Sequence, residues 1–75
     1  MTAKQMGLII LRERKKLPPE SMARHKVAEK AGISESHLCL IEQGKRKPSL
    51  DIAMKIAESL GIDKCDFIRL LGFKN

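Results

Sequence analysis

The sequence predicts a single all-α domain built from five short helices. Apolar residues recur at helical spacing in five segments, and no segment shows the two-residue alternation of a half-buried strand. Glycines and prolines separate these segments, at points where helices usually end. The chain has 75 residues, 43% of them hydrophobic but only two aromatic, so we expect one domain over residues 1–75 with an aliphatic core.

The first helix is expected over residues 3–16. Leu8 and Leu11 recur at helical spacing, and several cations follow in the last turn, where they interact favourably with the helix dipole. Further apolar surface on this helix comes from Met6, Ile9 and Ile10. Either the segment that follows the helix or a protein partner must cover that surface.

The second helix lies between Pro18-Pro19 and Gly32. Its apolar stripe consists of Ala23, Val27, Ala28 and Ala31. The start of the helix is open at this stage, because either Ser21 caps it or Pro19 is its first residue. Gly32 suits the left-handed position that ends a helix.

Three more helices follow, each introduced by a capping side chain. Ser34 precedes the third helix, in which Leu38 and Ile41 have the spacing of a buried face and Gly44 marks the end. Ser49 can cap a fourth helix that ends at Gly61, with the stripe Leu50, Ile52, Ala53, Ile56, Ala57 and Leu60. Asp63 and Asp66 can cap a fifth helix, which carries Phe67, Ile68, Leu70 and Leu71.

Charge is distributed unevenly along the chain, which has a formal net charge of +6. Residues 1–47 hold 11 basic and 5 acidic side chains, whereas residues 48–75 hold 4 of each. Such asymmetry indicates a surface for a polyanion, either nucleic acid or an anionic membrane. The longest apolar stretch, Met6 to Leu11, is far too short for a membrane span, so we expect a cytoplasmic protein without a membrane partner.

Function is carried by the second and third helices, joined by Ala31-Gly32-Ile33-Ser34. Two helices linked by a short turn with a glycine are typical of a helix-turn-helix, whose second helix can enter the major groove. The sequence resembles the phage-repressor-like family typified by lambda repressor and Cro, in the stretches Val27 to Leu38, Ile41 to Ser49 and Ile56 to Ile62. The resemblance covers about residues 8–72 and implies a compact five-helix bundle.

The resemblance also implies which residues contact DNA. Positions that match Glu35, Ser36 and Leu40 meet base edges in this family. A carboxylate can accept from cytosine N4, and Leu40 is either a thymine methyl contact or an isolated surface residue. Contacts to the DNA backbone are expected from Arg24, Gln43, Lys45, Arg46 and Lys47.

Two structural expectations follow from the same comparison. Arg12 and Glu42 match positions where the family places an ion pair, so we expect a partly buried pair rather than two independent surface charges. The segment Pro18 to Met22 adds about five residues before the second helix, and Arg24 replaces the usual Gln. Either an Arg24–Glu35 pair preserves the link to the third helix, or the insertion shifts the approach to DNA.

The predicted function is sequence-specific binding of double-stranded DNA by a transcriptional regulator, in particular a repressor. An enzyme is not expected, because no acid, base and nucleophile are paired by spacing, and neither a cofactor nor a metal site is indicated. The alternative is a protein-interaction module, such as the antitoxin of a toxin–antitoxin pair, with a partner at the first or the last helix.

A homodimer, formed either in solution or only on DNA, is expected through the last helix. The residues that suggest this contact are Phe67, Ile68, Leu70, Leu71 and Phe73, which crowd apolar surface into a short segment.

Overall fold

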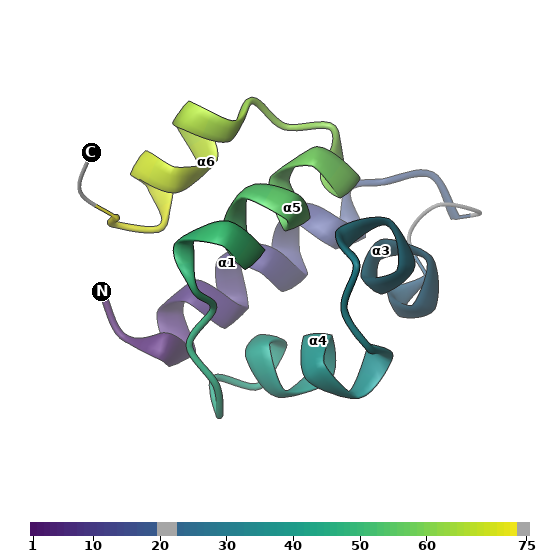
Figure 1. The fold of residues 1–75 in the computed structure, drawn as a ribbon, viewed down its shortest axis with the longest axis horizontal. Coiled ribbons are helices and arrows are strands. Elements are labelled where there is room, and N and C mark those ends of the chain that lie inside the picture. The colour runs from purple at the N-terminus through teal and green to yellow at the C-terminus, as the bar shows by residue number, and fades with distance from the viewer. Residues whose placement is uncertain (20–22, 74–75) are drawn as a thin grey trace.

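The computed structural model describes residues 1–19 and 23–73, and five α-helices lie entirely within them. They are α1 (Ala3–Lys15), α3 (Arg24–Ala31), α4 (Glu35–Glu42), α5 (Leu50–Leu60) and α6 (Lys64–Leu70). The predicted all-α class is confirmed, and Figure 1 shows how the helices are arranged.

Capping side chains begin four of these helices. Ser34, Ser49 and Asp63 each accept a hydrogen bond from the backbone N–H three residues later, as predicted, at 3.0 to 3.2 Å. Thr2 forms a capping box with Gln5 at the start of α1. Lys64 of α6 also forms an ion pair with Glu58 of α5. The hydrogen bond to Glu58 and the negative charge of Glu58 raise the pKa of Lys64.

The start of α3 differs from both predicted alternatives. The helix begins at Arg24, and its N-cap, Ala23, has no side chain that could accept a hydrogen bond. Ser21, the predicted cap, belongs to residues 20–22, which lie outside the described part of the chain. The insertion therefore does not lengthen α3 at its N-terminus.

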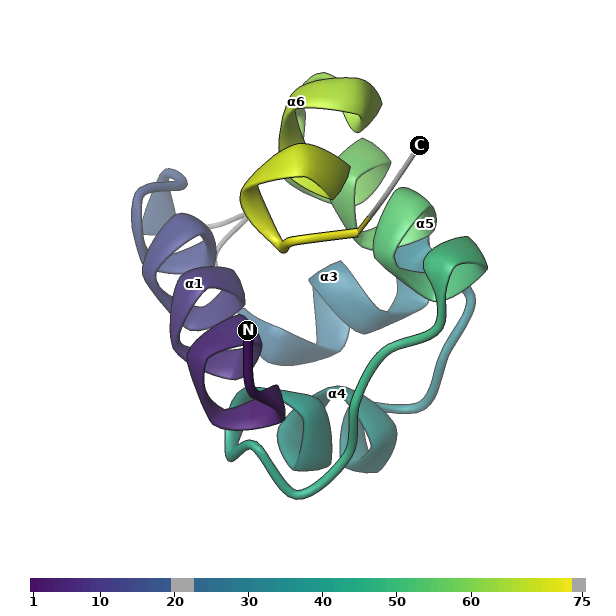
Figure 2. The ribbon, with the colours of Figure 1, turned by 90° about the vertical axis from the view of Figure 1, so that its left-hand side faces the viewer.

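The helices surround one core. α1 packs on α4, α3 packs on both α4 and α5, and α6 packs on α5. Figure 2 shows α1 along one side of the molecule, α4 at the lower edge and α6 at the top. The largest side chains that are fully buried in this core are Phe67, Met6, Ile10, Leu38, Ile41, Ile56, Leu71 and Val27.

α1 turns the opposite face from the expected one toward this core. Met6 and Ile10 are buried and Ile9 packs partly against the core, whereas Leu8 is 48% exposed and Leu11 is half-buried. The apolar surface that was expected to need a covering segment or a partner is therefore covered by the rest of the domain.

The apolar residues of the C-terminal segment are also mostly covered within one chain. Phe67, Ile68 and Leu71 are buried, and Phe73 packs partly against the core, which leaves Leu70 with 50% of its surface exposed. α5 packs against α6, so the domain itself covers most of the apolar surface that was expected to contact a second copy. Among the described residues, no helix has the length and apolar character needed to cross a membrane.

Candidate nucleic-acid interface

The connection between α3 and α4 is a tight turn that begins at Gly32. This residue has φ 73°, a left-handed conformation that glycine adopts without the steric cost of a Cβ. The N–H of Ile33 donates to the carbonyl oxygen of Ala28 at 3.0 Å, which closes the end of α3. Ser34 then caps α4 at once, so that two packed helices are joined by three residues.

α4 has one buried and one uncovered face. Leu38, Ile41 and Glu42 are buried against the rest of the domain. The exposed residues on the opposite side include Ser36, Leu40 and Gln43, and Glu35 is exposed at the first residue of the helix. All three predicted base-contacting residues are thus accessible, with Leu40 37% exposed.

Gln43 closes this face at the C-terminal end of α4. Its Nε2 lies 3.3 Å from the Sγ of Cys39, which is half-buried one turn earlier on the helix. The Gln43 side chain therefore lies back along α4 in this structure and would have to leave the cysteine to reach a DNA phosphate.

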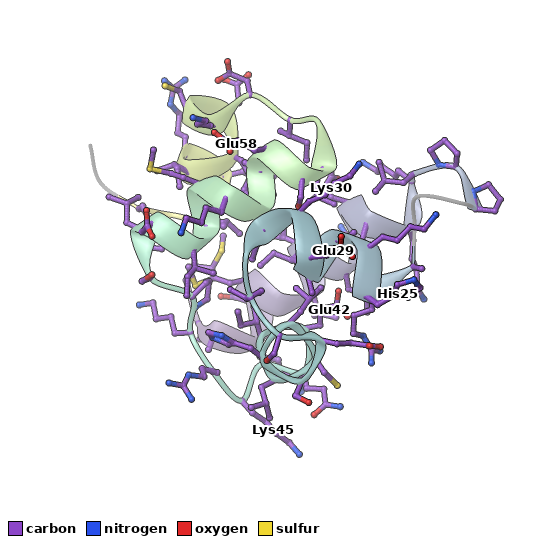
Figure 3. All side chains as sticks on the ribbon, turned by 45° about the vertical axis from the view of Figure 1, so that its right-hand side comes forward. His25, Glu29, Lys30, Glu42, Lys45 and Glu58 are labelled. Atoms are coloured by element: carbon purple, nitrogen blue, oxygen red, sulfur yellow. The ribbon has the colours of Figure 1, made fainter. Side chains whose placement is uncertain are left out.

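A sharp turn at Gly44 connects α4 to residues 45–47, which we call the basic loop. Gly44 has φ 75°, and the N–H of Lys45 donates to the carbonyl oxygen of Leu40 at 2.9 Å. Lys45, Arg46 and Lys47 are exposed, whereas Pro48 is buried. In Figure 3 α4 is seen nearly end-on, and Lys45 extends beyond it at the lower edge of the molecule.

The first turn of α1 brings a further cation to this loop. A Cβ added to Gly44 would lie 2.6 Å from the Cα of Lys4, so the two backbones are in close contact. Lys4 is exposed beside the basic loop, 40 positions away in sequence from Gly44. Nothing in the local pattern around Lys4 could have indicated this proximity.

A buried ion pair joins α1 to α4, with a different arginine from the predicted one. The Nε of Arg14 donates to Oε2 of Glu42 at 2.6 Å, and Nη2 of Arg14 donates to Oε1 at 3.1 Å. The two side chains are only 9% and 3% exposed. Arg12, the predicted partner of Glu42, lies on the exposed face of α1. The predicted Arg12–Glu42 pair is therefore wrong, although Glu42 was correctly placed in a buried pair.

Arg24 approaches the same carboxylate from α3. Its Nε lies 3.4 Å from Oε1 of Glu42, but the N–H direction does not make a hydrogen bond, so this contact is electrostatic only. Of the two alternatives for Arg24, the pair with Glu35 is not formed, because the acid that Arg24 approaches is Glu42. Two arginines and one carboxylate leave a net positive charge here, and the Arg24 side chain is 38% exposed.

Three helices are thus connected at Glu42, which lies between α3 and α4 in Figure 3. The signal for Arg14 was present in the sequence, because Arg14 follows Met6 and Ile10 at intervals of four residues. Within residues 1–19 and 23–73, no three His, Cys, Asp or Glu side chains gather as metal ligands.

The fold and this surface define a helix-turn-helix domain. A family profile described as helix-turn-helix matches residues 10–67 of the chain. The chain belongs to this family, which is the phage-repressor type of DNA-binding domain that the sequence indicated. The family is not enzymatic, which confirms the expectation that the chain is not an enzyme.

Two known proteins share stretches of this sequence. A 40-residue stretch, 53% of this chain, is 52% identical to 5% of the replication factor C small subunit of Thermococcus kodakarensis. A 44-residue stretch, 59% of this chain, is 39% identical to 58% of the HTH-type transcriptional regulator YqaF of Bacillus subtilis. The matched part of this chain covers less than two thirds of the length of each relative.

Proposed function

We propose that this protein binds double-stranded DNA in a sequence-specific manner, with α4 in the major groove. The observation that carries the proposal is the uncovered face of α4, which ends in a loop of three exposed cations. An α-helix fits the major groove, where polar and apolar side chains can distinguish all four base pairs. The cations at the end of the helix then meet the phosphates that border the groove.

The residues divide into two groups by chemistry. The proposed base contacts are three exposed residues of α4, Glu35, Ser36 and Leu40, through a carboxylate, a hydroxyl and an apolar side chain. The proposed backbone contacts are Lys4, Arg24, Gln43, Lys45, Arg46 and Lys47. Lys4 is added to the predicted group because it adjoins the basic loop in space.

The biological role that we propose is transcriptional regulation, with repression as the expected sign. Support comes from the partial match to YqaF, which is named as an HTH-type transcriptional regulator. A small domain that occupies a promoter in the major groove excludes other proteins from the same DNA, which is the simplest way for it to regulate.

Duplex binding should depend steeply on salt, because each neutralised phosphate releases counterions. Replacing Lys45 or Arg46 by Ala should weaken binding to all duplexes alike and reduce the magnitude of the salt slope by about 1 for each lost contact. Fluorescence anisotropy with a labelled duplex at several salt concentrations measures both quantities. Lys55→Ala, an exposed lysine on α5, is the matched control and should leave the slope unchanged. An affinity that stays immeasurable at low salt would contradict the proposed function.

Base preference should respond to substitutions on the face of α4. Ser36→Arg and Leu40→Gln should each change the preferred base at one position, by about 1–3 kcal/mol of discrimination. Selection of bound duplexes from a randomised pool, followed by sequencing, reports this preference. Leu50→Gln changes an exposed leucine on α5 in the same way and should preserve the wild-type profile. Unchanged profiles for both α4 variants would show that this face does not read the bases.

We further propose that two copies bind two half-sites about 34 Å apart, because one helix offers few base contacts. On α6, Leu70 is left for a contact between copies after the burial of Phe67, Ile68 and Leu71. Such a small interface should be stable only on DNA, so we expect a monomer alone and a 2:1 complex on a palindromic duplex. Sedimentation equilibrium distinguishes these states. A 1:1 complex on the full palindrome would refute the pairing of half-sites.

A further inference from the structure

The outer face of α1 carries leucines and cations that the fold does not use. Leu8 is 48% exposed and Leu11 is half-buried. Together with Arg12 and Lys15 they line a shallow groove of about 220 Å³, which we call the α1 groove. Positions 8, 11, 12 and 15 follow the spacing of one helix face, so the groove runs along the helix.

This face lies opposite the one that packs into the domain. The side chains of Met6, Ile10 and Arg14 are buried in the domain. Leu8 and Arg12, on the other side of the same helix, are exposed. No acidic side chain lines the α1 groove. The acidic residue of α1, Glu13, binds Lys16 at 2.7 Å instead. The groove is therefore both apolar and positively charged.

The α1 groove begins one helical turn beyond Lys4, the one residue of α1 that we assign to the DNA interface. Figure 2 shows α1 along one side of the molecule, whereas α4 lies at the lower edge. Phosphate contacts need cations but gain nothing from an exposed leucine beside them. The pairing of Leu8 and Leu11 with Arg12 and Lys15 is better suited to a protein segment than to a DNA backbone.

We propose that the α1 groove docks an acidic amphipathic helix of a partner protein. Apolar side chains of that helix would pack on Leu8 and Leu11, and flanking carboxylates would pair with Arg12 and Lys15. A second copy of this chain does not fit, because a symmetric contact places the same patch on both sides. Arg12 and Lys15 of each copy would then face their counterparts, which is electrostatically unfavourable.

A designed helical peptide tests the proposal, with leucines at positions i, i+3, i+4 and i+7 and glutamates flanking them. In amide NMR spectra of the full chain, this peptide should shift signals of residues 8–15 and leave those of α4 unchanged. Leu8→Gln should weaken binding about tenfold, as expected for an anchor side chain. Arg12→Glu should weaken it at least as much. Leu50→Gln is the matched control on α5 and should bind like the wild type.

The same peptide with lysines in place of the glutamates should not bind, because its lysines would face Arg12 and Lys15. It has the same leucines, so it differs from the first peptide only in charge. Equal binding of both peptides, or shifts centred outside residues 8–15, would overturn the proposal. It would also be overturned if duplex DNA shifted the signals of residues 11–15, which lie two or more turns from Lys4, or if the signals moved with protein concentration alone. Thermal unfolding of each variant verifies that it is folded, which is expected because Leu8 and Arg12 are exposed.

Discussion

Replacing Glu42 by Ala should lower the free energy of unfolding by about 3–5 kcal/mol, the typical cost of removing one partner from a buried ion pair. The carboxylate of Glu42 is 3% exposed and accepts two hydrogen bonds from Arg14. Its loss removes a carboxylate and two hydrogen bonds from the Arg14 guanidinium, which is itself only 9% exposed. Arg24 loses its electrostatic partner in the same step.

Urea unfolding of single and double variants measures this effect. Arg14→Met with Glu42→Leu should cost less than the two single replacements summed, because the two side chains contact each other directly and each single replacement already removes that contact. Arg12→Ala is the matched control, since Arg12 is an exposed arginine on the same helix, and its effect should stay within about 0.5 kcal/mol. Additive costs for the pair, or an equal cost for Arg12→Ala, would contradict the role assigned to Arg14.

Loss of Glu42 should also change how α4 is positioned in the proposed DNA interface. Its carboxylate connects α1 and α3 to the last turn of α4, directly before the turn into the basic loop. A carboxylate that pairs with two other helices restricts how α4 can move relative to them. We therefore regard Glu42 as a positioning residue for α4, whose own side chain is too deeply buried to contact a base.

The helix-turn-helix could be predicted because its signals are local. Ser34 is a capping residue directly before a helical apolar pattern, and Gly32 sits where a left-handed residue must end α3. Leu38 and Ile41 define the buried face of α4, so the uncovered face follows from the geometry of a helix. These features need no information from distant parts of the chain.

The inner face of α1 is ambiguous in the sequence. Leu8 with Leu11 and Met6 with Ile10 both have helical spacing, so the sequence offers two candidate inner faces. The pairing of Arg12 with Glu42 had a different source, because it was inferred from the resemblance to the family. The structure turns Met6 and Ile10 inward, and Arg14 follows them one turn later. Contacts between distant helices decide between two faces of similar hydrophobicity.

For the C-terminal segment, the sequence does not indicate how much of the apolar surface is covered within the domain. Its apolar residues were counted correctly, but the area that α5 offers to cover them depends on how the two helices cross. Phe67 and Leu71 are fully buried in the domain, and only Leu70 on the outer side of α6 remains largely exposed. The number of apolar residues in a segment thus does not by itself indicate an interface.

Gly7→Ala should destabilise the protein by about 2–3 kcal/mol, in the range expected for overpacking of a close contact. A Cβ at this position would collide with the carbonyl oxygen of Ile41 and would lie 2.7 Å from that of Glu42. Both atoms belong to the backbone of α4, so no flexible side chain can move aside to make room. Alanine favours a helix over glycine by about 1 kcal/mol, which is too little to offset the collision.

Leu8→Ala is the control for this variant, because it changes the adjacent residue of α1 on the exposed face and should alter stability by no more than about 0.5 kcal/mol. Both variants are compared by urea unfolding. A stabilised Gly7→Ala protein would mean that helix propensity dominates and that α1 does not press against α4 at this point. The expected loss would instead show that α1 presses against α4 at Gly7, in addition to the Arg14–Glu42 pair that joins the same two helices, and would support α1 as the element that fixes the helix that we propose reads DNA.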